Sequence, residues 1–253
     1  MMNINYQPLQ TDISFSEAAK FKTSFGKLPG AAWAGIVLVV LMTGYFVFSG
    51  NIFGVLIPVV IAGIAYFALL ANKKKEIRFK AFAEANGFEY ISSGEPGVET
   101  GSVFEGGHAR HAKRIVHGTY NLPFWLGTYV YSLGVASNSR TVKVGVMSIQ
   151  LPASFPHILI DGGLHALGSA KAKGGFVEYQ NVDPTVSEVY KVLYPEGQEH
   201  ALQTIVTPDL LYTMRNRVPR KVDVEIRGDR MYLYTGMLLE PTEKNLKTLF
   251  TIL

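Results

Sequence analysis

The sequence predicts an α+β protein in which an N-terminal transmembrane helical hairpin precedes a cytoplasmic domain with a mainly antiparallel sheet and a few helices. Two observations support this prediction. No charged residue stands between Lys27 and Lys73, and beyond Phe88 apolar and polar residues alternate in short runs separated by glycines. Runs of strands with helices placed near their ends are typical of an α+β fold and not of a parallel βαβ repeat.

The uncharged segment consists of two apolar runs, Ala31–Gly50 and Ile52–Ala71. Each run has about 20 residues, and a helix of that length, rising about 1.5 Å per residue, crosses a hydrocarbon core about 30 Å thick. We therefore divide the chain into a tail with a short amphipathic helix (1–29), a two-helix transmembrane hairpin (30–72) and a soluble α+β domain (73–253).

Positively charged residues flank the hairpin at its two outer ends and are missing from its turn. They are Lys20, Lys22 and Lys27 before it, and Lys73, Lys74, Lys75, Arg78 and Lys80 after it. Because Lys and Arg collect on the cytoplasmic side, we expect a cell-membrane protein with two spans and both termini in the cytoplasm. The spans lack ionisable side chains, which mark ion pathways, so a pump or transporter made from this pair alone is not expected.

The tail contains a Ser-x-x-Glu capping-box pattern at Ser14–Glu17, followed by Ala18, Phe21 and Phe25 at helical intervals until Pro29. This pattern predicts a short amphipathic helix. With lysines interleaved, the helix could lie in the lipid headgroup region, or it could pack on the soluble domain of the same chain. The sequence leaves both interpretations open.

Several runs in the soluble domain alternate as strands do. Tyr129–Val135 and Val142–Val146 predict a hairpin, and Phe155–Asp161 predicts a third strand that ends at a pair of glycines. Val222–Ile226 and Met231–Thr235 predict a second hairpin around a two-residue Gly-Asp turn, with one apolar face.

Helices are predicted at three places in this domain. Lys73–Ala85 leads from the membrane and is ended by the Asn-Gly pair that follows it. Thr207 can cap a second helix, because a proline and an aspartate occupy the first turn after it. Pro241–Glu243 opens a last helix with Leu246 and Leu249 on its apolar side.

The composition narrows the chemistry. The chain has 253 residues, no cysteine and a formal net charge of +4. The lack of cysteine excludes disulfides, thiol catalysis and Cys-based zinc sites, and the modest charge gives no reason to expect a nucleic-acid partner. The sequence has no Gly-x-Ser-x-Gly elbow and no phosphate-binding glycine motif, so no cofactor is predicted.

Three segments of the soluble domain are distinctive, namely Leu151–Asp161, Tyr194–Gly197 and Ala201–Asp209. Together they resemble a bacterial family of two-span membrane proteins known only as a domain of unknown function. The resemblance extends from the hairpin to about Tyr234 and includes the Lys-rich exit helix. It implies the same architecture and a membrane location, and it brings no activity or catalytic residue.

The densest polar group in the chain contains His108, His111 and His117. Three imidazoles and a water can form an open zinc site, but the Arg and Lys residues between these histidines would repel a dication. The other interpretation is a basic, solvated strand edge. Further along, His157 and Asp161 would lie on one side of a strand about 13 Å apart, so we expect His157 to be a structural histidine bonded to the backbone.

Two groups of cations could contact lipid or a partner. They are Lys73, Lys74 and Lys75 after the hairpin, and Arg215, Arg217, Arg220 and Lys221 after the Thr207 helix. Each group also has an interpretation without a ligand. The first can be a topology signal alone, and the second can be a solvated helix end whose cations complement the helix dipole.

The function hypothesis is a membrane-anchored cytoplasmic binding or scaffold module. Its ligand would be a partner protein, a second copy of the chain or anionic lipid headgroups. The alternative is a membrane-associated enzyme, for instance a hydrolase that uses the cluster of His108, His111 and His117.

Overall fold

The computed structural model describes residues 4–20, 30–50, 52–95, 99–135, 138–164, 174–217, 222–236 and 239–253. The chain divides into two compact units. Thr11–Arg78 forms one, which we call the helical unit, and Met1–Gln10 with Phe79–Leu253 forms the other, which we call the folded unit.

The helical unit contains α2 (Phe15–Lys20), α3 (Gly30–Phe48) and most of α4 (Ile52–Ala85). The predicted exit helix is not separate, because α4 runs from the second apolar run through the lysines without interruption. Among the described residues, one helix, at Gly54–Ala85, is long and apolar enough to cross a membrane, and Val37–Phe48 is a shorter apolar helix. The two-span hairpin therefore stays a prediction.

The predicted start of α2 and end of α4 are confirmed. Ser14 and Glu17 form the capping box: the Ser14 amide donates to Glu17 Oε2 at 2.8 Å and the Glu17 amide donates to Ser14 Oγ at 3.2 Å. At the end of α4, Gly87 has a φ of +68°, and the Phe88 amide bonds the Ala83 carbonyl at 2.8 Å. A positive φ at this position is typical of helix C-termini and favours glycine. The rest of the predicted tail helix, 21–29, lies outside the described residues.

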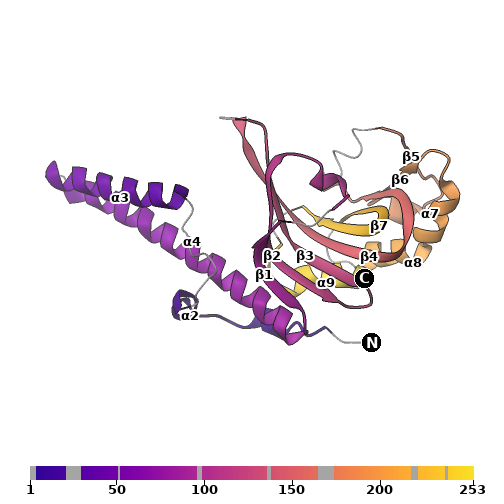
Figure 1. The fold of residues 1–253 in the computed structure, drawn as a ribbon, viewed down its shortest axis with the longest axis horizontal. Coiled ribbons are helices and arrows are strands. Elements are labelled where there is room, and N and C mark those ends of the chain that lie inside the picture. Colours follow the sequence, from indigo (N-terminus) through magenta and orange to yellow (C-terminus); the bar gives the residue numbers. More distant parts are fainter. Residues whose placement is uncertain are drawn as a thin grey trace. The chain divides into compact units, whose positions relative to one another are not determined.

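The folded unit is α+β, and the described strands form one antiparallel sheet of seven strands (Figure 1). The strands are β1 (Glu89–Gly94), β2 (His108–Thr119), β3 (Pro123–Leu133), β4 (Arg140–Asp161), β5 (Phe176–Glu178), β6 (Lys191–Pro195) and β7 (Asp223–Thr235). Their order is β1-β2-β3-β4-β6-β5, and β7 pairs along the other side of β4. The predicted hairpin of β3 and β4 is confirmed, with Tyr129 opposite Val144.

Short helices surround this sheet. They are α1 (Gln7–Gln10), the 3₁₀ turn η1 (Ser102–Phe104), α6 (Pro184–Ser187), α7 (Glu199–Ile205), α8 (Pro208–Asn216) and α9 (Glu243–Ile252). The predicted cap of α8 is confirmed, because Thr207 Oγ1 accepts from the Leu210 amide at 3.2 Å. The predicted start of α9 is also confirmed, and there Thr242 Oγ1 accepts from the Asn245 amide at 3.3 Å.

The predicted second hairpin is wrong. β7 is one continuous strand, and it pairs with β4 from Val224 to Thr235, with Met147 opposite Leu233 and Ile158 opposite Ile226. Gly228, with a φ of +62°, does not reverse the chain but lies opposite Phe155, where the register of both strands shifts. A long ladder satisfies more backbone groups than two short arms, so the glycine serves a bulge rather than a turn.

The run Phe155–Asp161 is likewise the second half of β4 and not a separate strand. β4 bends as it passes from β3 to β6, as Figure 1 shows. The predicted end of this run at Asp161 is confirmed.

Both faces of the sheet are covered. One face packs against apolar side chains from the end of α4 and from α9, including Phe79, Phe82 and Leu249. The other face carries a second apolar cluster that includes Phe104 and Tyr129. The residues that point away from the helices are therefore buried as well, which places the candidate site between the sheet and the segment that covers its second face.

Candidate functional site

The second face of the sheet is covered by residues Glu99–Glu105, which we call the strap. Its anchor is Phe104, whose ring lies 4.6 Å from the ring of Tyr129 and 5.6 Å from that of Tyr232, between centroids. The Trp125 ring is 6.1 Å away. Only 5% of Phe104 is exposed, so it fills an aromatic cleft on the sheet.

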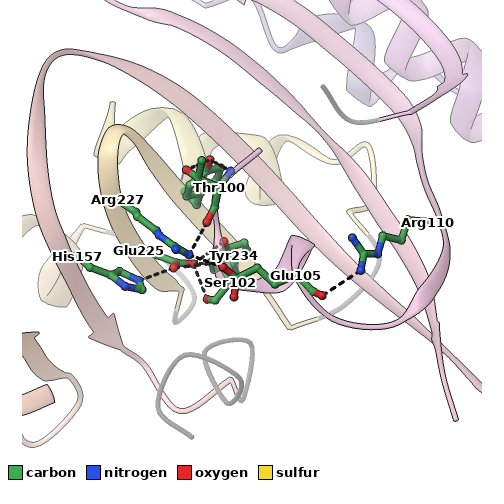
Figure 2. A network of polar contacts seen from close by, with 9 residues as sticks. Thr100, Ser102, Glu105, Arg110, His157, Glu225, Arg227 and Tyr234 are labelled. Carbon is green, nitrogen blue, oxygen red and sulfur yellow. Dashed lines mark hydrogen bonds and ion pairs between the residues drawn. The ribbon is translucent and has the colours of Figure 1, made fainter. Parts of the chain in front are cut away.

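Glu225, near the start of β7, holds the strap from the sheet side. Its carboxylate is fully buried and accepts from the Ser102 amide at 2.9 Å and the Ser102 hydroxyl at 2.7 Å. The Tyr234 hydroxyl donates to the same oxygen at 2.8 Å, and His157 Nε2 lies 2.6 Å from the other one. Figure 2 shows Ser102, Tyr234 and His157 converging on this carboxylate from three directions.

Two opposing effects set the pKa of Glu225. Burial disfavours the charged carboxylate and raises the pKa, but hydrogen bonds from His157, Ser102 and Tyr234 favour it and prevail. The pKa of Glu225 therefore lies below its usual value, and the group is a carboxylate at neutral pH. The pKa of the Tyr234 hydroxyl is raised well above its usual value by burial and by the Glu225 charge, so this hydroxyl remains a donor.

Glu99 makes the reciprocal connection from the strap to the sheet. Its carboxylate accepts from Trp125 Nε1 at 2.6 Å, from the Tyr232 hydroxyl at 2.8 Å and from Ser148 Oγ at 3.2 Å. Burial raises the pKa of Tyr232 to about 12, so its hydroxyl also remains protonated. The rings of Tyr232 and Tyr234 stack with 6.0 Å between their centroids. Because these tyrosines bond Glu99 and Glu225, the two carboxylates lie beside the same pair of stacked rings.

Arg227 closes the outer side of the network. Its guanidinium donates to the Thr100 carbonyl at 2.7 Å and to Glu105 Oε1 at 2.6 Å. Arg110, from β2, donates to the Glu105 carbonyl at 3.0 Å. The strap is thus bound to β2, β3, β4 and β7 through charged groups, each of which has a donor or acceptor opposite it. Figure 2 shows the contacts with Arg110 on β2 and with Glu225 and Arg227 on β7.

A small hollow of about 250 Å³ opens beside this network. Its lining residues are Ser102, Glu105, His157, Gly174, Gly175, Phe176, Pro195 and Arg227. Ser102 donates its hydroxyl proton to Glu225 and not to His157, so this is not the serine–histidine arrangement that activates a nucleophile. The contacts of Glu225 and Arg227 fix the strap, and the hollow beside them can hold a polar group of a ligand against His157 and Arg227.

The structure does not bring the three predicted histidines together. His108 lies opposite Ser132 at one end of β2, whereas His117 lies opposite Trp125 near the other end. His108 Nε2 bonds the Gly134 carbonyl at 2.8 Å, and His111 Nδ1 bonds the Ala109 carbonyl at 3.2 Å. Among the described residues, no group of three or more His, Cys, Asp or Glu side chains could hold a metal ion.

The two predicted basic groups belong to different units. Lys73, Lys74 and Lys75 lie on α4 in the helical unit. Arg215 and Arg217 lie at the exposed end of α8 in the folded unit, where Arg215 Nε donates to the Thr185 carbonyl at 3.1 Å. Arg220 and Lys221 lie outside the described residues.

Arg215 also lines a groove of about 950 Å³ between α6, α7 and α8, which we call the α8 groove. Its other lining residues are Tyr179, Asn181, Asp183, Thr185, Val186, Gln203, Val206, Pro208, Leu211, Tyr212 and Asn216. Apolar, amide and charged side chains are therefore mixed along it.

The sequence interpretation missed the carboxylate network. It predicted that His157 bonds the backbone, whereas the partner of this imidazole is Glu225. A signal was present: the face of β7 that carries Glu225 also carries Tyr232 and Tyr234 instead of small or charged residues. Aromatic residues on a face that ought to be solvated indicate a second covering layer.

No protein-family model matches the sequence, and no curated protein matches it. Among solved structures, the fold is similar to the crystal structure of the mycobacterial trehalose monomycolate transport factor A, TtfA. The TM-score is 0.42 and the identity 12%, with 70% of this chain and 89% of that chain covered. No activity transfers at this level of similarity.

Proposed function

We propose that this chain is a membrane-anchored binding module. In this proposal α3 and α4 cross the cell membrane as two spans, both termini are cytoplasmic, and the folded unit binds a partner protein or anionic lipid headgroups beside the membrane. The observation that supports the proposal best is the exposure of apolar side chains on α3 and α4.

These helices expose large apolar side chains on all sides. They are Val37, Leu38, Val40, Leu41, Val47 and Phe48 on α3, and Leu56, Ile57, Val59, Val60, Ile61, Ile64, Phe67 and Leu69 on α4. A soluble protein rarely exposes an apolar surface of this extent, and a helix that is apolar all round needs a protein core or a bilayer to cover it. Lipid supplies that cover.

The α8 groove supports a binding role for the folded unit. It holds about 950 Å³, and the exposed ring of Tyr212 and the amides of Asn181 and Gln203 stand along it. Apolar anchors beside amide groups suit a polypeptide segment, whose side chains need pockets and whose backbone needs hydrogen bonds. The hydrolase alternative has no such support, because the structure separates its three histidines.

The membrane part is tested with single cysteines, since the natural chain has none. Ser49→Cys stands in the predicted turn and Thr251→Cys near the C-terminus. A membrane-impermeant maleimide added to intact cells should label Ser49→Cys, and it should label Thr251→Cys only after permeabilisation. Labelling of Thr251→Cys in intact cells, or release of the chain from membranes by alkaline carbonate, would overturn the proposal.

The binding part is tested by photo-crosslinking in native membranes. A crosslinking amino acid replaces Tyr212 in the α8 groove or, as a control, exposed Lys143 on β4. A discrete adduct that forms at position 212 and not at 143 is expected. Equal adduct patterns at both positions would show that the groove is not a specific binding surface.

A further inference from the structure

We infer that the helical unit carries a lipid-binding surface formed by α2 and residues Phe67–Arg78 of α4, which we call the interfacial belt. It lies in the headgroup layer and prefers anionic lipids. This inference rests on the proposed insertion of α4 in the membrane and adds where the membrane surface meets the chain.

The contacts that fix α2 within this unit come from α4. The ring of Phe15 meets that of Phe67 edge-on with 5.5 Å between centroids, and Lys74 Nζ lies 3.8 Å from the centre of the Phe15 ring. Before the helix, the Thr11 carbonyl accepts from Arg78 Nε at 3.2 Å. Of the two interpretations that the sequence left open, these contacts favour the one in which α2 accompanies the apolar helix.

The orientation of α2 follows from its buried and exposed residues. Ala18 is fully buried, whereas Phe15 is 46% exposed and Ser14 and Glu17 are exposed. Hydrogen bonds from the Ser14 side chain and backbone lower the pKa of Glu17, so the capping box is charged at neutral pH. The helix therefore presents a half-exposed aromatic ring beside polar groups, as interfacial helices do.

The position of these contacts along α4 sets their depth. The apolar part of α4, Ile52–Ala71, is about 30 Å long at about 1.5 Å per residue, which matches the hydrocarbon core. Phe67 lies about one turn before the end of that part, and Lys74 lies just beyond it. Phe15 touches both residues, so α2 is attached at the level where hydrocarbon gives way to headgroups.

The charge and aromatic content of the belt select its ligand. Lys73, Lys74 and Lys75 follow one another at this level, and Lys20 ends α2. Next to the belt, exposed Tyr66 adds an amphipathic ring of the kind that gathers at membrane surfaces. Because the belt continues the exposed apolar surface of α4 without a break, its occupant is the same bilayer, and the lysines favour a leaflet with anionic headgroups.

Depth is measured with a spin label on single-cysteine variants of the full chain in nanodiscs of phosphatidylcholine with a minor share of phosphatidylglycerol. At Ile61→Cys, midway along the apolar part of α4, the label should be reached by oxygen and not by a water-soluble nickel complex. At Ala19→Cys, one turn after Phe15, it should show intermediate accessibility. If the Ala19 label is as accessible to nickel as one at Asp209→Cys on α8, the belt is refuted; if the Ile61 label is water-exposed, the proposed anchoring itself fails.

Lipid preference is measured by the quenching of a fluorophore at Ala19→Cys by spin-labelled phosphatidylglycerol or phosphatidylcholine. Phosphatidylglycerol should quench several-fold more strongly at equal mole fraction, and replacing Lys73, Lys74 and Lys75 by glutamine should bring the ratio close to one. The control variant Lys143→Gln, Lys191→Gln, Lys244→Gln has the same charge change outside the belt and should keep the ratio. Equal quenching by the two lipids in the parent chain would overturn the preference for phosphatidylglycerol. A quenching ratio that falls in the control variant and not in the belt variant would overturn it as well.

Discussion

The helical unit and the folded unit place their apolar and charged groups in opposite ways. Phe48 on α3 is 96% exposed and Leu41 is 65% exposed, whereas in the folded unit Glu225 is fully buried and Asp223 beside it is also fully buried. The first arrangement is stable where lipid replaces water. The second is stable because donors surround the carboxylates. Under the proposed anchoring, exposure therefore has meaning only relative to the medium that surrounds each unit.

The largest effect is expected from charges in the apolar helix. The double variant Ile57→Asp and Ile61→Asp places two carboxylates on one side of α4, at a cost of about 3 kcal/mol each in a bilayer centre. The fraction of chain that resists carbonate extraction should fall sharply. The matched variant Ile57→Ala and Ile61→Ala should stay in the membrane. If the aspartate variant stays fully in the membrane fraction, the contrast between the two units fails, because α3 and α4 would then be covered by something other than lipid.

The next effect concerns the buried carboxylate. Glu225→Gln removes the charge that Ser102, Tyr234 and His157 surround, and the free energy of unfolding of the folded unit should fall by about 3–5 kcal/mol. Urea unfolding of the full chain in detergent, followed by tryptophan fluorescence, measures this loss. As a control, Glu178→Gln removes an exposed ion pair with Lys191 at 3.5 Å and should cost less than about 1 kcal/mol. Equal losses would show that the network is not what holds the strap.

Two phenylalanines sharpen the contrast between the units. Phe104→Ala empties the aromatic cleft under the strap and should lower the free energy of unfolding by about 3 kcal/mol. Phe48→Ala removes a ring of the same size from an exposed position and should change it by less than about 0.5 kcal/mol. The same urea titration compares both. A Phe104→Ala variant as stable as the parent would mean that the strap is held by its polar contacts alone.

A smaller effect is expected from pH. A carboxylate whose pKa is lowered on folding adds stability above its unfolded pKa, near 4.5 for Glu225, and loses it as the pH falls through the lower folded value. The stability difference between the parent and Glu225→Gln should therefore be constant near pH 7 and shrink below about pH 4.5. Urea unfolding midpoints of the parent and of Glu225→Gln at several pH values measure this stability difference. A difference that persists unchanged in acid would assign the loss to packing and not to charge.

Local features of the fold could be predicted from the sequence because they depend on neighbouring residues. The Ser14 capping box, the Thr207 cap and the helix end at Gly87 each need only a few adjacent side chains, and the structure confirms all three. The predicted hairpin of β3 and β4 is likewise present, because its strands follow one another in the chain. Around Gly228, however, the same local reasoning chose a turn, because it could not weigh the long ladder that β7 forms with a strand far away in the chain.

The candidate site was beyond local reasoning for the same reason. Ser102 and Glu225 are 123 residues apart, and Glu99 and Tyr232 are 133 apart. No spacing rule joins such residues, and His157 gave no sign that its partner would be a carboxylate on β7. The histidine cluster shows the converse: residues close in sequence were drawn apart because an extended strand carries them along its length.

The sequence by itself determined where the apolar segments lie and where several helices begin and end. It also determined that the folded part is an antiparallel α+β unit. Each of these features depends on composition or on short periodic patterns. Only the tertiary structure decided that the strap covers the second face of the sheet and that Glu225 is buried beneath it. The physical reason is that a buried carboxylate is stable only when donors from several distant strands and loops meet at one point, and that meeting is a property of the packed chain.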